Sequence, residues 1–517
     1  MKKPSHFLAS IFLAGAIVLS SCAPAASPTA ATKPIEAPKP VVAATVATAP
    51  TTAPAKPVDA AKPTEAAKPT EAAKPVEAAK PTTAPSASSA PAVAPAAAVQ
   101  TGGLGSPVDG LDLKAPVEIT FWHTQTGPLA DGLKKIVDDF NKKNPNVKVK
   151  AEYGGNYTQL YQKAMASLQG GDLPDIAVAY ESMVADYMKA NAIVALEDYV
   201  NSSKYGLSKA DLDDIFPFAI SRNRFPQFQN KLLSFPFTTS NLNMYFNADM
   251  LKSVGQNGPP ETWEDFYTVC KAIKDKLSKP CYAASVDAST VHGMIFSFGG
   301  TLLDSTNTKT LYDQKPTIDA MELLERMTKE GMVYQIKPAS FDDQNDLATE
   351  KVAFIIRSST TRAFLDGLIK DKFKWGMSII PQGKDNKEKA TTLFGANVTI
   401  FKSTPERQLA SWMFLKYFAS TEVTSEWGAV GGYTPVRRTG ATVDPYKSYL
   451  AKEPIINKVA LDNMQFSRPE PNLLGYQDIR PVLEDAQTAV LAGKMTGQQA
   501  AKKMKEEADK ILADKRS

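Results

Sequence analysis

The chain has 517 residues, of which 43% are hydrophobic and 22% charged, a composition typical of soluble globular proteins. Its formal net charge of +4 comes from the first hundred residues, because residues 101–517 carry equal numbers of acidic and basic side chains. A region without net charge lacks the basic face that nucleic-acid binding needs. The three histidines, one of them His6 near the N-terminus, leave few ligands for a histidine-built metal site or a catalytic triad. We therefore expect no nucleic-acid partner, no metal and no cofactor.

Residues 1–22 have the features of a bacterial lipoprotein signal peptide. Lys2 and Lys3 form a positively charged start, and residues 7–19 are largely apolar but too few to span a bilayer. The sequence Leu-Ser-Ser-Cys that ends at Cys22 resembles a lipobox, in which the cysteine receives a lipid. A cleaved secretory signal with a chance cysteine is the alternative. We expect lipid on Cys22 to anchor the protein at the extracellular face of the cytoplasmic membrane.

Residues 23–111 are predicted to be a disordered linker. Residues 23–100 hold 15 of the 37 prolines and contain no Phe, Trp, Tyr, Leu, Met or Gly, so they cannot bury enough apolar surface to offset chain entropy. A repeat of Ala-Ala-Lys-Pro-Thr-Glu near residues 60–79 favours extended polyproline II. The linker would act as a tether, and the folded region would span residues 112–517.

The folded region alternates strands and helices. Apolar patterns predict strands at residues 117–122, 147–153 and 175–180, with helices at 129–140 and 157–168. This alternation favours an α/β protein with a layered sheet. Ligands of such sheets bind at the carboxyl ends of strands, so the residues that follow the three strands should share one rim. These rim residues are 122–125, 154–157 and 180–182.

The second half of the chain continues the mixed pattern. Further strands are predicted over residues 352–356 and 393–401, the latter interrupted by Gly395, and further helices over 263–274, 407–418, 481–491 and 498–512. Cys270 and Cys281 lie eleven residues apart, and in an exported protein they could form a disulfide. Two buried free thiols are an equally open alternative.

Several motifs together resemble those of a known family. They are Phe-Trp-His at 121–123, Gly-Asn-Tyr at 155–157, Leu-Pro-Asp-Ile at 173–176, Pro-Phe-Thr-Thr-Ser-Asn at 236–241 and Gly-Tyr-Thr-Pro-Val at 432–436. Their order resembles the carbohydrate-type extracellular solute-binding proteins of ATP-binding-cassette (ABC) importers, over about residues 116–512. The resemblance implies an α/β, two-lobed, type II periplasmic-binding-protein-like fold with a hinge crossed three times. Lobe 1 would comprise about residues 116–245 and 396–430, and lobe 2 about 246–395 and 431–517.

Within that family the motifs resemble most the glycerol-3-phosphate-binding branch. The resemblance implies a set of ligand-binding residues at Tyr157, Glu181, Ser240, Ser359, Gly395, Tyr433 and Arg480. The branch also carries a ligand-contacting Trp after a second-lobe strand. Here residues 287–296 contain no Trp, and His292 is their most distinctive side chain.

Each of these residues also has a structural interpretation. Arg480 offers a planar fork of donors that suits phosphate, at an expected helix start before Pro481, but by position alone it could be a surface salt-bridge residue. Glu181 could accept hydrogen bonds from hydroxyls or simply begin a helix. Ser240 and Ser359 could cap turns. Tyr157 and Tyr433 could belong to a core, and Gly395 to a strand bulge. Trp122 and His123 are expected to be structural.

The resulting expectation is a binding protein, not an enzyme, that delivers a small polar solute to the membrane subunits of an ABC permease. Glycerol 3-phosphate or a glycerophosphodiester is the favoured solute, and a neutral sugar or oligosaccharide is the alternative. The protein is expected to act as a monomer. A glycoside hydrolase that uses Glu181 with Asp175 lacks a visible catalytic motif. A sensor that docks on a receptor cannot be separated from an importer by these residues.

Overall fold

The computed structural model describes residues 106–338 and 340–516. The predicted signal peptide, Cys22 and all of the predicted linker up to residue 105 therefore lie outside the described residues. The described residues all belong to one compact unit, and the fold below is that of this unit. Within the described part of the chain, no helix combines the length and hydrophobicity needed to cross a membrane.

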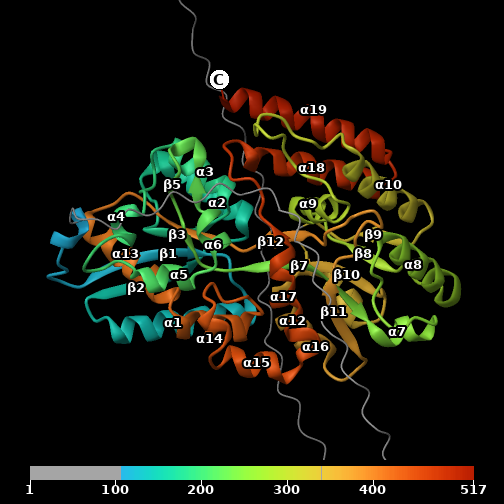
Figure 1. Cartoon of the computed structure of the whole chain (residues 1–517), viewed down its shortest axis with the longest axis horizontal. Helices are drawn as coiled ribbons and strands as arrows, with labels where there is room; N and C mark the ends of the chain where they lie inside the picture. Colours follow the sequence, from blue (N-terminus) through green and yellow to red (C-terminus); the bar gives the residue numbers. More distant parts are fainter. Residues whose placement is uncertain (1–105, 339, 517) are drawn as a thin grey trace, which may run out of the picture. The chain divides into compact units, whose positions relative to one another are not determined.

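The first lobe, residues 106–239 and 396–445, is built on a five-stranded sheet. Its strand order is β2-β1-β3-β13-β6, with β1, β2 and β3 parallel and β13 antiparallel to both of its neighbours. The bounds are β1 Val117–His123, β2 Val147–Tyr153, β3 Ile176–Ala179, β6 Phe235–Pro236 and β13 Asn397–Ile400. The helices α1 Gly127–Lys143, α2 Tyr157–Gly170 and α13 Pro405–Phe418 pack against this sheet (Figure 1).

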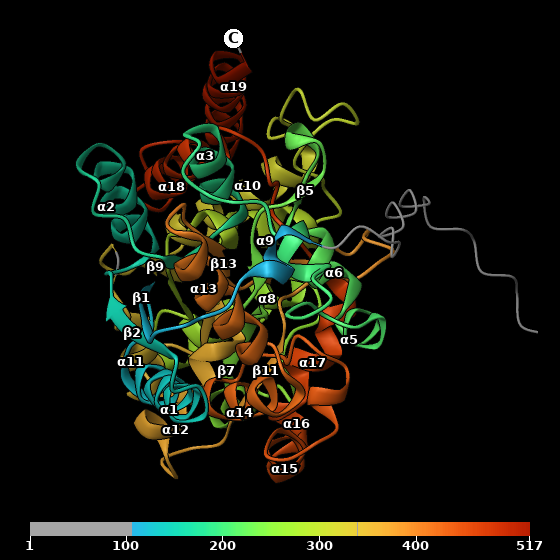
Figure 2. The same cartoon turned by 90° about the vertical axis from the view of Figure 1, so that its left-hand side faces the viewer.

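The second lobe, residues 240–394 and 454–516, is built on a larger mixed sheet, and residues 446–453 contact both lobes. Its order is β14-β12-β7-β10-β8-β9, and β11 also pairs with β7. The bounds are β7 Ser240–Asn247, β8 Tyr282–Ala284, β9 Val333–Gln335, β10 Phe354–Ser358, β11 Trp375–Ile379, β12 Thr391–Phe394 and β14 Ser467–Arg468. Its main helices are α8 Trp263–Leu277, α9 Ala288–Ser297, α10 Lys315–Lys329, α18 Tyr476–Leu491 and α19 Gly497–Arg516, and α19 packs on α18 and α10 (Figure 1 and Figure 2).

Shorter elements connect these layers. The short helices are α3 Glu181–Lys189, α4 Glu197–Val200, α5 Lys209–Asp214, α6 Pro217–Ser221, α7 Ala248–Ser253, α11 Asp342–Ala348, α12 Arg362–Ile369, α14 Thr421–Gly431, α15 Tyr446–Lys452, α16 Pro454–Asn457 and α17 Val459–Asp462. Single 3-10 turns are η1 Pro107–Gly110, η2 Pro226–Phe228, η3 Ser359–Thr361, η4 Thr439–Ala441 and η5 Asn463–Phe466, and β4 Arg224–Phe225 pairs with β5 Lys231–Leu232.

Helix α1 shows how the sequence specifies its element. Its apolar residues recur on one face and are buried: Leu129, Leu133, Ile136, Val137 and Phe140. Pro128 occupies the first turn, where a missing N–H is harmless, and Asn144 ends the helix just before Pro145. Helix α2 begins with the Asn156 side chain accepting the N–H of Gln159.

The two hydrophobic cores place the lobe crossings at positions that differ from the expected ones. Strand β7 pairs with β10, β11 and β12, and Leu242 and Met244 lie in the second core, so the first crossing precedes Ser240 instead of lying near residue 245. Tyr433 and Val436 pack in the first core, whereas Ile456 packs with the second sheet. The third crossing therefore lies beyond Val436, not at residue 431.

Gly395 makes the second crossing, between β12 and β13. Its φ of +120° is a backbone conformation that side-chain-bearing residues rarely adopt, and an added Cβ would lie 2.2 Å from the Thr238 carbonyl oxygen. The strand predicted over residues 393–401 is therefore two strands in two different sheets. The first and second crossings run side by side, because Thr238 donates its backbone N–H to the Ala396 carbonyl oxygen at 3.0 Å.

Residues 106–111, expected to belong to the linker, are part of the fold. Ser106 caps η1, Val108 is buried in the first core, and the Asp109 carboxylate accepts the Ser203 hydroxyl at 2.9 Å. The folded region thus begins no later than Ser106.

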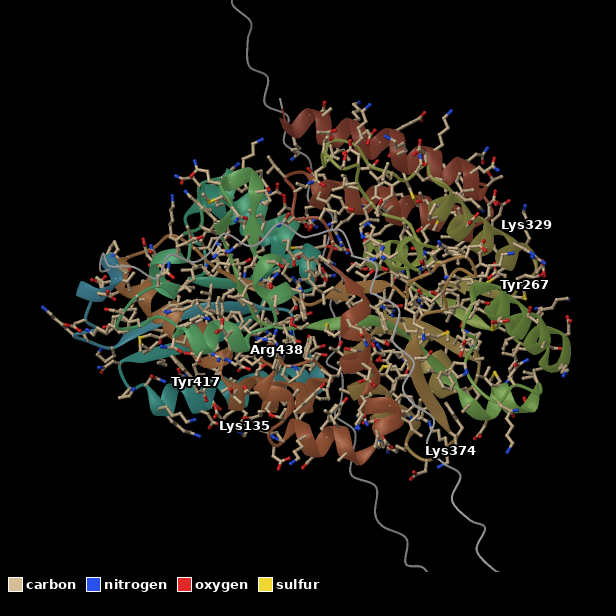
Figure 3. All side chains as sticks on the ribbon, viewed as in Figure 1. Lys135, Tyr267, Lys329, Lys374, Tyr417 and Arg438 are labelled. Carbon is tan, nitrogen blue, oxygen red and sulfur yellow. A yellow bond between two sulfur atoms is a disulfide. The ribbon has the colours of Figure 1, made fainter. Side chains whose placement is uncertain are left out.

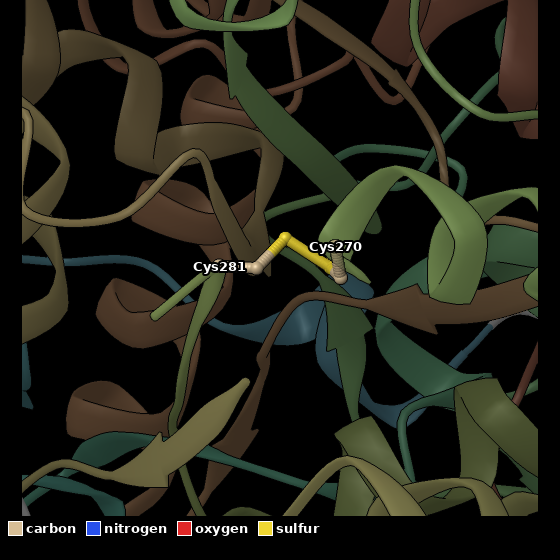
Figure 4. The surroundings of a disulfide bond; sticks show 2 residues. All are labelled: Cys270 and Cys281. Atoms are coloured by element: carbon tan, nitrogen blue, oxygen red, sulfur yellow. A yellow bond between two sulfur atoms is a disulfide. The ribbon is translucent and has the colours of Figure 1, made fainter. Parts of the chain in front are cut away.

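Cys270 of α8 and Cys281 before β8 form a disulfide, with their Cα atoms 5.0 Å apart (Figure 4). The two cysteines are therefore not free thiols, which was the alternative left open by the sequence.

Charged residues on the outer helices are paired at helical spacing or between helices. Lys329 lies 2.6 Å from Glu325 on α10, and Lys135 of α1 reaches Glu426 of α14 at 2.7 Å (Figure 3). Such exposed pairs each contribute less than about 1 kcal/mol. The buried cores, not the surface charges, therefore position the functional site.

Candidate solute-binding site

A cavity of about 340 Å³ lies between the two lobes and is lined by both. Ser and Thr hydroxyls and aromatic rings make up most of its lining, and the only charged residues among its described lining are Asp287 and Arg357. Such a mixture of aromatic faces and a few polar groups is typical of small-molecule sites. The cavity therefore suits a small solute with several oxygen groups.

Strand ends of the first lobe supply one wall. Residues 124–126 follow β1, and Tyr180 follows β3, so the parallel topology brings them to the same edge. Tyr157, the first residue of α2, stacks on Tyr180 with ring centroids 4.2 Å apart. Burial raises the pKa of both phenols, which therefore stay neutral and can donate hydrogen bonds.

Helix starts and a strand end of the second lobe supply the opposite wall. The Asp287 side chain caps α9 by accepting the N–H of Ser289 at 2.8 Å, and both residues line the cavity. Arg357, at the end of β10, forms two bonds with Asp343, from Nε at 2.6 Å and from Nη2 at 2.8 Å. Its charge is thus balanced within its own lobe.

Four of the predicted ligand-binding residues line the cavity: Tyr157, Ser240, Gly395 and Tyr433. The Ser240 hydroxyl accepts that of Ser358 at 3.1 Å, which joins the two strands β7 and β10 at the cavity floor. The Tyr433 ring stacks on Trp427 with centroids 5.3 Å apart, and its hydroxyl faces the Gln125 amide oxygen at 3.5 Å. These groups come from both lobes and from the crossings between them.

Ser359 and Glu181 do not line the cavity. The Ser359 hydroxyl donates to the Gly432 carbonyl oxygen at 3.0 Å, and its neighbour Ser358 faces the cavity instead. The Glu181 carboxylate is buried and forms an ion pair with Arg222, whose guanidinium also donates to the Gly395 carbonyl oxygen. Through Arg222, Glu181 is therefore linked to the Gly395 crossing and not to the cavity itself.

Arg480 also lies behind the cavity wall. Its Nη1 donates to Glu470 at 2.6 Å and its Nη2 to the Ser289 hydroxyl at 3.0 Å, and its guanidinium carbon lies 5.1 Å from the Tyr180 ring centroid. Burial alone would raise the pKa of Glu470, but Arg480 and His292 outweigh burial and lower it to about 2. Helix α18 begins at Tyr476, so Arg480 lies inside the helix. The predicted position of Arg480 at a helix start is therefore wrong.

The two described histidines have structural partners. His292 is fully buried, shares a 2.7 Å hydrogen bond with Glu470 and lies 3.1 Å from the Tyr312 hydroxyl, outside the cavity lining. It therefore does not take the place of the branch's ligand-contacting Trp. Burial lowers the pKa of His123 to about 4, and its Nδ1 accepts the N–H of Gln125 at 3.2 Å. A neutral His123 thus shapes the loop after β1.

Sequence reasoning missed several lining residues. Arg357 directly follows the strand predicted over residues 352–356, and Gln125 belongs to the predicted rim, but neither was assigned a contact with the solute. Asp287, Phe341 and Gln344 gave no recognisable signal, because only the tertiary fold brings them to the cavity. Among the described residues, no group of three or more His, Cys, Asp or Glu side chains is arranged so that it could hold a metal ion.

Comparisons with known proteins agree with this architecture. In sequence, the chain is 25% identical to the sn-glycerol-3-phosphate-binding periplasmic protein of Escherichia coli strain K12 over 421 residues, which covers 77% of this chain and 93% of that protein. In structure, it matches UgpB of Mycobacterium tuberculosis in complex with glycerophosphocholine, with a TM-score of 0.69, 20% identity and coverage of 78% and 100%. It also matches the acarbose-binding GacH receptor of Streptomyces glaucescens, with a TM-score of 0.69, 18% identity and coverage of 78% and 100%.

The expected two-lobed α/β fold is therefore confirmed. A family model described as bacterial extracellular solute-binding protein matches residues 135–454, more than half of the chain. The family and these relatives are binding proteins and not enzymes, which sets the glycoside hydrolase alternative aside. The chain belongs to the bacterial extracellular solute-binding proteins, the substrate-binding components of ABC importers.

Proposed function

We propose that the interlobe cavity captures a glycerophosphodiester or glycerol 3-phosphate, which the protein delivers to the membrane subunits of its ABC permease. The observation that carries this proposal is the cavity itself, because both lobes line it with hydroxyl groups, aromatic rings and one guanidinium. The 25% identity to a glycerol-3-phosphate-binding protein over 93% of its length supports the choice of solute. Lipid on Cys22 would keep the protein near the permease.

The lining suits a glycerol derivative in chemical terms. The stacked Tyr157 and Tyr180 rings offer an apolar face to the carbon chain of glycerol, and the Ser240 and Ser358 hydroxyls can bond to its oxygens. Closure of the two lobes on the solute would exclude water and strengthen these hydrogen bonds. Binding, without any bond being made or broken, is all that this arrangement requires.

A neutral sugar is the second candidate, and one observation favours it. Arg480, the cation that the family resemblance assigns to phosphate, is held by Glu470 at 2.6 Å and lies behind the wall. The remaining charged lining consists of one acid, Asp287, and one base, Arg357. A cavity without excess positive charge does not select strongly for a dianion.

Calorimetric titration of the full chain with glycerophosphocholine, glycerol 3-phosphate and maltose tests the proposal. We expect saturable binding of at least one phosphate compound, with maltose weaker by tenfold or more. Tight binding of maltose alone would support the second candidate and refute the first. Failure of all three solutes to bind would refute the phosphate assignment and exclude maltose as the sugar.

A further inference from the structure

Gln125 presents an unsatisfied donor at the cavity. Its side chain is only 4% exposed and lines the cavity from the loop after β1. The amide oxygen faces the Tyr433 hydroxyl at 3.5 Å, but the amide nitrogen is buried without a hydrogen-bond partner among the described residues. A buried donor without an acceptor is unfavourable, so such groups usually meet a ligand or a bound water. Because Gln125 belongs to the lining, an acceptor that enters the cavity is a candidate partner for this amide nitrogen.

Arg357 presents donors from the opposite lobe. The fully buried Asp343 carboxylate takes its Nε and Nη2, and the Ser340 carbonyl oxygen takes Nη2 at 3.1 Å. These bonds fix the guanidinium plane, and within the described residues Nη1 has no hydrogen-bond partner. The Phe341 ring, 62% exposed at the cavity edge, has its centroid 5.4 Å from the guanidinium carbon.

We propose that Gln125 and Arg357 are solute-binding residues of this chain, and that each takes an acceptor oxygen of the solute from its own lobe. Resting on the proposed function, this inference also narrows the solute class. The guanidinium of Arg357 is fixed by these bonds, and its two remaining Nη1 N–H groups can donate to acceptor oxygens, as in a phosphodiester or in neighbouring sugar hydroxyls. Since Asp343 already balances its charge and Asp287 lies in the same cavity, a singly charged phosphodiester fits better than a dianionic phosphate monoester.

The two residues lie in different lobes, which predicts a second effect of the solute. Gln125 belongs to the first lobe and Arg357 to the second, so a solute held by both would bridge the lobes. A solute that bonds to both walls binds the closed arrangement of the lobes more tightly than the open one, and it therefore stabilises the closed arrangement. Loss of either donor should therefore weaken binding without changing the fold of either lobe.

The test is calorimetric titration of the full chain and its variants with glycerophosphocholine, glycerol 3-phosphate and maltose. Gln125→Met removes the donor at nearly constant volume and should weaken glycerophosphocholine binding by roughly tenfold, the usual effect of one neutral hydrogen bond. Arg357→Lys keeps a cation beside Asp343 but loses the two Nη1 N–H donors, and should weaken glycerophosphocholine binding by roughly ten- to hundredfold.

Matched controls separate recognition from stability. Gln487→Met removes another buried amide, and Arg437→Lys changes another buried, paired arginine, and neither residue lines the cavity. Both controls should bind glycerophosphocholine as the wild type does. Because Arg357→Met alone would strand Asp343, the double variant Arg357→Met with Asp343→Asn provides the full deletion. A melting temperature within a few degrees of wild type shows that a variant is folded.

The outcomes are distinguishable. The proposal is supported if the wild type binds glycerophosphocholine and if both Gln125→Met and Arg357→Lys weaken this binding. The loss of glycerophosphocholine affinity must also exceed the loss of maltose affinity. Wild-type binding that is unchanged in Gln125→Met and in both folded Arg357 variants overturns it while leaving the proposed function intact. Binding of maltose alone with the same dependence keeps the two residues and assigns Arg357 to sugar hydroxyls. A wild type that binds no solute overturns the proposed function and this inference with it.

Discussion

Replacing Arg480 with alanine should destabilise the fold, and not only remove a contact with a solute. Arg480 donates to Glu470 at 2.6 Å, and both side chains are largely buried. Removing one partner of a buried ion pair costs about 3–5 kcal/mol, because the remaining charge has lost both water and its counter-charge. The phosphate role and the structural role of Arg480 therefore predict different results from the same variant.

The pKa of Glu470 gives an independent value for the free energy that its ion pair with Arg480 contributes. Burial opposes its ionisation, yet Arg480 and then His292 lower its pKa to about 2 from the ordinary 4.5. At about 1.4 kcal/mol for each pKa unit, the folded state favours the carboxylate by about 3 kcal/mol. Since the folded-state pKa is depressed, this stability is present above about pH 4.5 and is lost as the pH falls toward 2.

Chemical denaturation of the full chain at pH 7 measures the effect. Arg480→Ala should lower the free energy of unfolding by about 3 kcal/mol or more, and adding Glu470→Gln should recover much of the loss because no buried charge then lacks a partner. Arg326→Ala is the matched control, since Arg326 and its partner Glu330 are exposed, and it should cost less than about 1 kcal/mol. A loss below about 1 kcal/mol for Arg480→Ala would refute the structural role.

Three further predictions follow from the fold. Replacing Cys270 and Cys281 by alanine opens a loop of eleven residues and should lower stability by about 3 kcal/mol, seen as a lower melting temperature in calorimetry. Burial, and then Asp287, raise the pKa of Glu484 to about 7. Glu484→Gln should therefore stabilise the protein increasingly from pH 4.5 to above pH 7 and leave its stability unchanged below pH 4. A profile of melting temperature against pH that runs parallel to that of the wild type would contradict this. Gly395→Ala forces a Cβ against the Thr238 carbonyl and should cost about 1–3 kcal/mol while weakening glycerophosphocholine binding, and an unchanged melting temperature and affinity would show that the crossing adapts.

The helices and the first sheet were accessible from the sequence because their signals are local. The apolar spacing that predicted a helix over residues 129–140 is found in α1, and the helix expected over residues 407–418 corresponds to α13. The second sheet was less accessible. Strand β7 is central because it pairs with β10, β11 and β12, more than a hundred residues farther along the chain. Such pairing depends on the tertiary context and not on the strand's own composition, which explains the misplaced crossing near residue 245.

The candidate site divides in the same way. The rule that ligands bind at the carboxyl ends of strands predicted a shared rim that includes Gln125, Tyr157 and Tyr180, and all three line the cavity. The rule succeeds because the backbone alone positions these residues. The long charged side chains could not be placed by the same reasoning, because several rotatable bonds let them reach different partners. Nothing local in Asp-Ile-Arg reveals that Arg480 meets Glu470 and a serine about 190 residues earlier in the chain.

Arg480 and Arg357 illustrate what finally decides such a role. Both are held by an acidic side chain at 2.6 Å, so the presence of a salt bridge does not separate a structural arginine from one that meets a solute. The difference lies in the geometry of what remains. Glu470 and Ser289 hold Arg480 behind the wall, whereas Asp343 holds Arg357 by one edge and leaves it in the lining. A motif can name the residue type that a phosphate needs, but only the position of its acidic partner determines which arginine remains available to the solute.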